Sequence, residues 1–325
     1  MNSAILSISG KNRPALRTAA RCLVAFSLGA ARLLDAQPAA QAKIIGRWDI
    51  TMQGENESFP SWLEVHLSGN RTLVGQFVGR TGSARPISKV EWADGAMRFS
   101  IPTQWDMGNE NFQIEGKLDG DKLAGAMSDA QGKKFTWIAV RAPSLRRAAK
   151  PTWGAPIALF NGKDLSNWTL TGNNQWTVAG GILGNPKPGS NLVSKQSFTD
   201  FKLHAEFRVP KGGNSGLYLR GRYEVQIEDS RGMEPGSLHL GGVYGFIAPN
   251  EDAARAPGEW QTYVITLVGR LVTVVLNGKT VISRQEIPGI TGGALDSDEG
   301  APGPIMVQGD HTSVEFRKLV ITPIK

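Results

Sequence analysis

The chain has 325 residues, with 36 Lys and Arg against 29 Asp and Glu, and a formal net charge of +7. This length exceeds the usual size of one hydrophobic core, so we expect two domains. A mild positive charge without a basic run gives no reason to expect nucleic acid as a partner, and no apolar run reaches the length of a membrane span. The 39 Gly and 18 Pro residues favour many short strands joined by tight turns.

Residues 1–42 have the pattern of a signal peptide. Four basic residues precede an apolar stretch at 22–31, and alanine-rich sequence follows. We therefore expect cleavage near Ala36 or Ala42 and a periplasmic or secreted protein, with an ordinary N-terminal helix as the alternative. Cleavage would remove Cys22, the only cysteine, so the mature chain would have no disulfide, no thiol nucleophile and no thiolate metal site.

Residues 43–141 contain several short runs in which apolar and polar side chains alternate, as in half-buried strands. The runs include 46–50, 62–67, 73–78 and 97–101. Turn sequences such as Asp94-Gly95 lie between them, at the spacing of an up-and-down meander. We expect a small antiparallel, lipocalin-like β-barrel, because closure removes exposed strand edges. Its tryptophans could form a sugar platform, but we expect them to fill the core.

A linker is predicted at 142–156, where prolines and basic residues occur without hydrophobic periodicity. Residues 157–325 then hold further alternating runs, among them 203–208, 263–268 and 314–321. Each run has one apolar and one polar face, which is typical of two sheets packed face to face. The predicted fold class is therefore all-β, with a sandwich following the barrel.

A hairpin is predicted around Gly221, and its register can be argued from the two strands. A two-residue loop would pair Leu219 with Glu224, which puts an apolar and an acidic side chain on one face. A three-residue loop instead pairs Tyr218 with Glu224 and places Gln226 on the same polar face. We favour the three-residue loop because it leaves the aliphatic residues together on the opposite face.

A series of short segments spans nearly all of residues 157–325. In chain order they are Phe160–Trp168, Asp200–Arg208, Gly213–Arg220, Tyr223–Ile227, Val243–Gly245, Pro257–Gln261, Leu276–Gly278, Gly303–Ile305 and Val314–Arg317. With these segments the region resembles the 3-keto-disaccharide hydrolase domain family. The resemblance implies a jelly roll of concanavalin or laminarinase type that acts on carbohydrate, specifically on glycosides whose C3 hydroxyl has been oxidised to a ketone.

The chemistry that the resemblance implies is elimination. A ketone at C3 acidifies the C2 proton, and the oxygen at C1 can then leave, with or without later addition of water. Such a site needs a base near C2, donors for the enolate oxygen and an acid for the leaving oxygen. We therefore expect a glycoside hydrolase or lyase that does not use the carboxylate pair of a retaining glycosidase.

The candidate base is Glu224, with His311 as the alternative because an imidazole titrates near neutral pH. Relative to the family pattern, the run 308–311 carries an extra glycine, which would move this imidazole out of the site. The expected substrate-binding residues are Asn214, Arg220 and Gln226 as donors, with Tyr218, Tyr244 and Gln308 as further contacts. The plainer interpretation of Glu224 is an exposed carboxylate paired with Arg220 or Arg222.

No cofactor is predicted with certainty. A calcium ion held by carboxylate oxygens is conceivable, although no ordered ligand loop is visible. Its candidate ligands are Glu206, Asp229 and Asp310.

Two other functions stay open. The sandwich could be a non-catalytic, lectin-like carbohydrate-binding module that stacks sugars on Tyr218, Tyr244 and tryptophans. Alternatively, the barrel could carry a ligand while the sandwich merely displays it.

Overall fold

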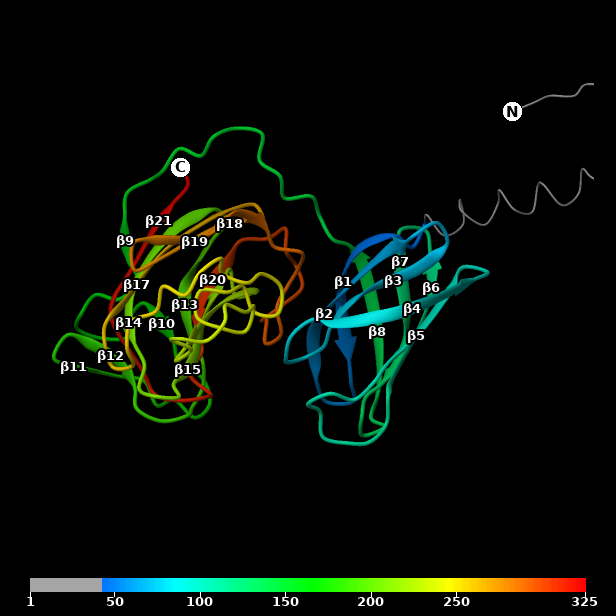
Figure 1. The fold of residues 1–325 in the computed structure, drawn as a ribbon, viewed down its shortest axis with the longest axis horizontal. Helices are drawn as coiled ribbons and strands as arrows, with labels where there is room; N and C mark the ends of the chain where they lie inside the picture. The colour runs from blue at the N-terminus through cyan, green and yellow to red at the C-terminus, as the bar shows by residue number, and fades with distance from the viewer. Residues whose placement is uncertain (1–42) are drawn as a thin grey trace, which may run out of the picture. The chain divides into compact units, whose positions relative to one another are not determined.

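A computed structural model describes residues 43–325, and the predicted signal peptide at 1–42 lies outside this range. The described residues contain strands and no helix, which confirms the all-β prediction (Figure 1). The first eight strands are β1 (Gly46–Gln53), β2 (Ser58–Ser68), β3 (Thr72–Val78), β4 (Arg85–Ala93), β5 (Ala96–Ile101), β6 (Phe112–Asp119), β7 (Lys122–Ser128) and β8 (Lys134–Arg141).

Strands β1 to β8 form a closed barrel in sequence order. Each strand pairs antiparallel with the next, and β8 pairs back onto β1, so no sheet edge is left open. The side chains alternate between buried and exposed, as in β5, and the buried ones fill the barrel core. At the β4–β5 turn, Asp94 and Gly95 have φ values of 51° and 77°, the left-handed conformation of a two-residue hairpin loop. The predicted meander and barrel are confirmed.

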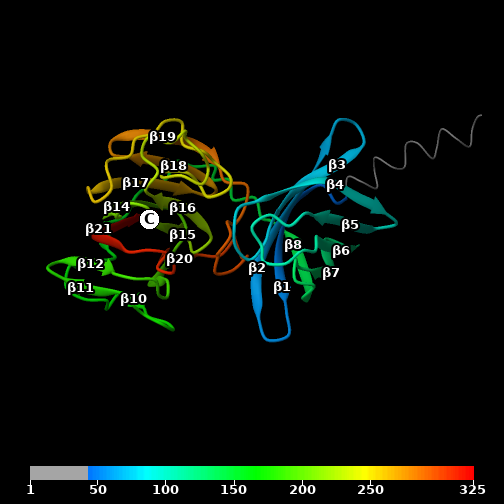
Figure 2. The same cartoon turned by 60° about the horizontal axis from the view of Figure 1, so that its bottom comes forward.

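The remaining strands form two further sheets (Figure 2). The five-stranded sheet has the order β10 (Trp168–Thr169), β13 (Leu192–Phe198), β20 (Gly303–Val307), β15 (Asn214–Leu219) and β16 (Tyr223–Glu228). The eight-stranded sheet has the order β11 (Thr177–Ala179), β12 (Ile182–Asn185), β21 (Val314–Pro323), β14 (Phe201–Arg208), β17 (Gln261–Val268), β18 (Leu271–Leu276) and β19 (Lys279–Glu286), with β9 (Ile157–Ala158) pairing to β21.

The two sheets share one hydrophobic core. Leu203 and Ile265 of the eight-stranded sheet and Leu217 and Val225 of the five-stranded sheet are fully buried in the same cluster. Strands β14 and β17 keep the alternation expected of a sheet with one buried face. The apolar face of each strand therefore packs between the sheets, as the sequence pattern predicts.

Strand β16 departs from this alternation, because five of its six residues are buried. Its apolar residues face the core, and its polar residues Glu224 and Gln226 are only 3% exposed. Covering segments explain this burial: Thr291 accepts a hydrogen bond from the Glu224 backbone, and Gly242 accepts one from that of Gln226. Such covered polar residues are costly unless they have partners, which makes this face the place to look for a site.

The barrel and the two-sheet region are in contact. Trp62 and Val78 of the barrel are buried in the same cluster as the core of the sheets, and the Trp62 ring packs edge-to-face on Phe246 with centroids 5.5 Å apart. The predicted linker is also anchored, since Arg147 donates a hydrogen bond of 2.7 Å to Asp200. Over residues 43–325, the structure has no helix that could span a membrane.

Candidate active site

A pocket of about 120 Å³ lies over the polar face of the β15–β16 hairpin. Seven of the eight site residues named from the sequence line it, and Arg220 does not. The lining residues are Thr81, Gly82, Asn191, Asn214, Tyr218, Glu224, Gln226, Tyr244, Gly292, Gly293, Gln308, Asp310 and His311. Wider hollows on the outside of the barrel gather no comparable set of buried polar groups. The pocket over the hairpin is therefore the candidate active site.

The hairpin has the register of the three-residue loop. Tyr218 pairs with Glu224, and Gly216 pairs with Gln226. Side chains of directly paired residues share a face and lie close together. The register therefore brings the phenol and the carboxyl group side by side, as the pattern of the two strands predicts.

Glu224 is buried against the strand beside it. A methyl group built on Gly216 would overlap this carboxyl group, so only glycine opposite leaves the space that it occupies. Burial raises the pKa of Glu224 to about 8, while the hydrogen bond from Tyr218 and the charge of His311 act in the lowering direction. The carboxyl group can therefore gain and lose a proton near neutral pH, which suits a general base. It is not the exposed, arginine-paired carboxylate of the plainer interpretation.

The hydroxyl of Tyr218 lies between two acceptors. It is 2.9 Å from Glu224 Oε2 and 3.0 Å from the carbonyl oxygen of Gly292. A phenol has only one proton to donate. When Glu224 is ionised, Tyr218 donates to it; when Glu224 is protonated, Glu224 can donate to Tyr218, which then donates to Gly292. Burial raises the pKa of Tyr218, which keeps the phenol protonated in both arrangements.

His311 and Asp310 form a pair at the pocket, and both side chains are about half exposed. The ring Nδ1 lies 2.7 Å from Asp310 Oδ1. This hydrogen bond raises the pKa of His311, and the nearby Glu224 adds to the increase, whereas the same bond lowers the pKa of Asp310. The imidazole is therefore favoured in its charged, proton-carrying form. The extra glycine at 309 leaves His311 in the pocket, contrary to the expected displacement.

Two glutamine side chains present oxygen atoms without a partner. The Oε1 atoms of Gln226 and Gln308 are buried and accept no hydrogen bond from any residue in 43–325. The amide nitrogen of Gln226 is 3.4 Å from Asn214 Oδ1, a long contact that orients both side chains. Buried polar atoms are rarely left without partners in folded proteins. Both glutamines line the pocket, so a bound molecule with hydroxyl groups could supply the missing donors.

Tyr244, which the sequence predicts, is half-buried, and its backbone donates a hydrogen bond of 3.0 Å to the Glu224 carbonyl.

The pocket residues that the sequence did not predict carried little or no signal in it. Asn191 is a lone amide directly before strand β13, and no local pattern marks it as a site residue. Thr81 and Gly82 belong to the barrel, so only the tertiary structure brings them to this pocket. The pair Gly292-Gly293 was the one available signal, because adjacent glycines mark a close approach of backbones.

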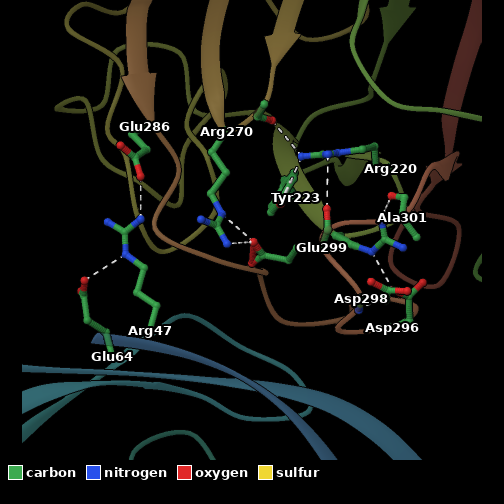
Figure 3. Close-up of polar contacts among 12 residues, drawn as sticks. Arg47, Glu64, Arg220, Tyr223, Arg270, Glu286, Asp296, Asp298, Glu299 and Ala301 are labelled. Carbon is green, nitrogen blue, oxygen red and sulfur yellow. Dashed lines mark hydrogen bonds and ion pairs between the residues drawn. The ribbon is translucent and has the colours of Figure 1, made fainter. Parts of the chain in front are cut away.

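Arg220 is a correction to the predicted site. It has a left-handed φ of 55° in the hairpin loop, which turns its side chain away from the pocket. Its guanidinium group donates to the Tyr223 hydroxyl at 3.2 Å and to the Gly269 carbonyl at 2.8 Å, and it is 1% exposed (Figure 3). Strand alternation predicts a side chain's direction only while the residue is in a strand. Arg220 is therefore structural in this position.

Arg220 belongs to a buried polar cluster beside the barrel, in which Arg270 pairs with Glu299 (Figure 3). Arg270 and Glu299 are 6% and 0% exposed. The barrel contributes Asp49, whose pKa burial and the charge of Glu299 raise to about 8. Arg270 is thus the cation with the largest favourable effect on both buried carboxyl groups, with smaller effects of Arg220 on Glu299 and of Arg222 on Asp49.

Arg270→Met is expected to lower the free energy of unfolding by about 3 kcal/mol, because Glu299 would remain buried without its partner. Thermal and urea unfolding at about pH 8 would measure the effect. Arg47→Met is the matched control, since Arg47 pairs with Glu64 and Glu286 at about 30% exposure (Figure 3). The control should lose about 1 kcal/mol or less. Equal losses for both variants would contradict this role of Arg270.

The three candidate calcium ligands, Glu206, Asp229 and Asp310, do not lie together. Glu206 pairs with Arg317, Asp310 with His311, and Asp229 accepts a hydrogen bond from the backbone of Gly212. Within residues 43–325, no three His, Cys, Asp or Glu side chains are grouped as a metal site. The residues present therefore do not fit a calcium ion bound by this set.

Comparison with known proteins identifies relatives of this chain. A 3-keto-disaccharide hydrolase of Bacteroides thetaiotaomicron is 27% identical over 134 residues, which is 35% of this chain and 46% of that protein. The match thus spans less than half the length of this curated relative. A solved structure of a candidate glycosyl hydrolase from Parabacteroides distasonis is 29% identical with a TM-score of 0.46, covering 56% of this chain and 96% of that one.

A second candidate glycosyl hydrolase structure from the same organism is 26% identical with a TM-score of 0.41, and it covers 52% of this chain and 98% of that one. The family model of the 3-keto-alpha-glucoside-1,2-lyase-like domain matches residues 155–322, which is just over half of the chain. This match includes every pocket residue except those of the barrel. The chain belongs to the family of the 3-keto-alpha-glucoside-1,2-lyase-like domain.

Proposed function

We propose that this protein is an enzyme that cleaves 3-keto-glycosides, including 3-keto-disaccharides, by removing the C2 proton and eliminating the oxygen at C1. The observation that carries the proposal is Glu224, a buried carboxyl group with a pKa raised to about 8, facing a pocket with unpartnered amide oxygens. Family membership and the name of the curated relative support the substrate class.

In the first step, ionised Glu224 takes the C2 proton. The C2–H electron pair forms the C2=C3 double bond, and the C3 carbonyl becomes an enolate oxygen. A raised pKa makes the carboxylate a stronger base than an ordinary glutamate. The proton that arrives on Glu224 is accommodated because Tyr218 can then donate to Gly292 instead.

In the second step, the enolate reforms the C3 carbonyl and a C1=C2 double bond, and the C1–O bond breaks. His311, held in its charged form by Asp310, gives its proton to the leaving oxygen. Water added across C1=C2 converts the unsaturated product to the free 3-keto-sugar and completes a hydrolysis. The base role of Glu224 thus follows the sequence prediction, while His311 takes the acid role.

A retaining glycosidase mechanism fits the site poorly. It requires two carboxyl groups about 5 Å apart on either side of the bond. The second glutamate of strand β16, Glu228, is four residues from Glu224, roughly 13 Å along a strand, and it does not line the pocket. Asp310, the other acid in the pocket, is paired with His311.

The purified protein is expected to release sugar from a 3-keto-disaccharide and none from the same disaccharide with an intact C3 hydroxyl, because only the ketone acidifies C2. Chromatography of the products would measure release, and mass spectrometry of a reaction in D₂O should find deuterium at C2 after water addition. Cleavage of both sugars at similar rates would exclude elimination. Binding of either sugar without turnover would favour the lectin-like alternative.

Export and the detailed fold class are part of the same proposal. The composition of residues 1–42 supports cleavage of a signal peptide and a periplasmic or secreted enzyme. The two sheets with one shared core support a concanavalin-like jelly roll for residues 157–325. Amino-terminal sequencing of protein from the producing cell would test the cleavage site near Ala36 or Ala42.

A further inference from the structure

The barrel contributes to the pocket through the loop between β3 and β4, residues 79–84, here named the barrel loop. Thr81 and Gly82 of this loop line the pocket together with Tyr218 and Glu224. The family match begins at residue 155, after the barrel. The barrel loop is therefore an addition to the site that family membership does not explain.

A short chain of hydrogen bonds connects the barrel loop to Tyr218. The carbonyl oxygen of Arg80 accepts a hydrogen bond of 2.9 Å from the backbone of Gly293. The neighbouring carbonyl, that of Gly292, accepts the Tyr218 hydroxyl at 3.0 Å. A methyl group built on Gly293 would lie 2.6 Å from that hydroxyl. The position of the 292–293 backbone thus decides where the Tyr218 hydroxyl can lie.

The barrel loop and the two-sheet region approach each other through backbone atoms. A methyl group built on Gly292 would overlap the backbone of Gly82, and one built on Gly245 would lie 2.6 Å from the Cβ atom of Ser83. Contacts this close leave little freedom for either side to shift. A displacement of the barrel loop would therefore move the Gly292 carbonyl.

Trp105, in the segment between β5 and β6, packs against the barrel loop. Its indole lies so close to Gly82 that a methyl group there would overlap the ring. The buried guanidinium of Arg85 stacks 4.6 Å from the ring centre and forms two hydrogen bonds of 2.7 Å with Asp106. Trp105 is 49% exposed, so half of this large apolar side chain remains in water. A rigidly held, half-exposed tryptophan is consistent with a role beyond filling the core.

We propose that the barrel loop, held in place by Trp105, is a wall of the active site and positions the Tyr218–Glu224 pair through Gly292 and Gly293. The barrel and the two sheets then form one catalytic unit, in which Trp105 is a positioning residue that does not touch the substrate. This inference rests on the proposed function for its activity readout, and it also has a readout that needs no substrate.

The test is Trp105→Ala in the full-length chain, with Trp92→Ala as the matched control. Trp92 is a partly buried tryptophan that packs on the same barrel core and does not line the pocket. Trp105→Ala is expected to lower kcat/KM for the 3-keto-disaccharide on the order of ten- to a hundredfold, because small displacements of catalytic groups have effects of this size. Trp92→Ala should retain wild-type kcat/KM when both variants are corrected for folded fraction.

The second readout is the titration of Glu224, followed by the ¹³C carboxyl signal that disappears in Glu224→Gln. When Glu224 is protonated, Tyr218 needs the Gly292 carbonyl as its acceptor, so displacement of that carbonyl destabilises the protonated form. A displaced barrel loop also admits water, which stabilises the ionised form. Both changes lower the pKa of Glu224. Trp105→Ala should therefore shift the titration below its wild-type value of about 8, and Trp92→Ala should not.

The two proposals fail in different ways. If the wild-type protein has no activity on any 3-keto-glycoside, the proposed function fails, and the Glu224 titration still tests the role of the barrel loop. If the wild type is active but Trp105→Ala matches Trp92→Ala in both kcat/KM and Glu224 titration, the inference is overturned. Loss of activity with an unchanged titration would also contradict it, because the effect would not pass through Tyr218 and Glu224.

Discussion

Glu224→Gln is expected to lower the rate of sugar release by about 10²- to 10⁴-fold, the usual contribution of a positioned general base. The amide has the same shape, so it fits the space opposite Gly216 and can still bond with Tyr218. It cannot take a proton from C2. Because the substrate contacts remain, KM should change little, and kcat/KM measured with a 3-keto-disaccharide should fall in parallel with kcat.

Glu228→Gln is the matched control for this variant. It makes the same change on the same strand, at a position that does not line the pocket. Its kcat/KM should stay within about twofold of the wild type, as expected for a residue outside the reaction. Equal losses in the two variants, or a fully active Glu224→Gln, would remove Glu224 as the base.

The Glu224→Gln variant should be more stable than the wild type at alkaline pH. The pKa of Glu224 is raised from 4.5 to about 8 in the folded protein, so the folded state keeps a proton that the unfolded chain releases. This contribution to stability is fully present below about pH 4.5 and is lost as the pH rises through about 8. Glutamine has no proton to lose. Melting temperatures should therefore be similar at about pH 5 and higher for Glu224→Gln at about pH 9.

His311→Asn is expected to lower kcat by about 10²-fold for a 3-keto-disaccharide, because the leaving alkoxide then departs without a proton. The loss should be much smaller for a 3-keto-glucoside of 4-nitrophenol, whose leaving group is stable as an anion. The charge of His311 lowers the pKa of Glu224, so its removal should also shift the rise of activity with pH to higher values. The fall in activity at alkaline pH, where the imidazole loses its proton, should disappear.

His239→Asn provides the control for removal of an imidazole. His239 lies on an exposed loop with its ring 2.9 Å from the Glu234 carbonyl, and it does not line the pocket. Its pH profile and its ratio of rates on the two substrates should match those of the wild type. Two results would refute the acid role of His311. His311→Asn could lose equal activity on both substrates, or its pH profile could still show the fall in activity at alkaline pH.

Local patterns predicted much of the fold because they depend on neighbours in the sequence. Alternation with period two placed most strands, and Asp94-Gly95 and Asn277-Gly278 have the left-handed φ values that such turns require. The hairpin register followed from keeping apolar residues on one face, and this register is what brings Tyr218 next to Glu224. Seven pocket residues could be named because the family motifs lie on these strands and on adjoining loops.

Arg220 was misplaced for a local reason. Its left-handed φ breaks the alternation of side chains between the two faces of the hairpin, and no sequence pattern predicts such a φ value at an arginine. The burial of Glu224 also could not be read from β16 by itself. The strand would present these polar residues to water if the segments at 240–244 and 287–302 did not cover it, and those contacts are set by the fold as a whole.

The sequence by itself determined the all-β class, the barrel meander, the register of the hairpin and the identity of its acidic residue, because each depends on short-range alternation and turn chemistry. Only the tertiary structure decided that the carboxyl group is buried, that its pKa rises to about 8, and that Thr81 and Gly82 reach the pocket. Desolvation depends on every segment that packs around a group, including ones more than a hundred residues away, and no local pattern records that sum.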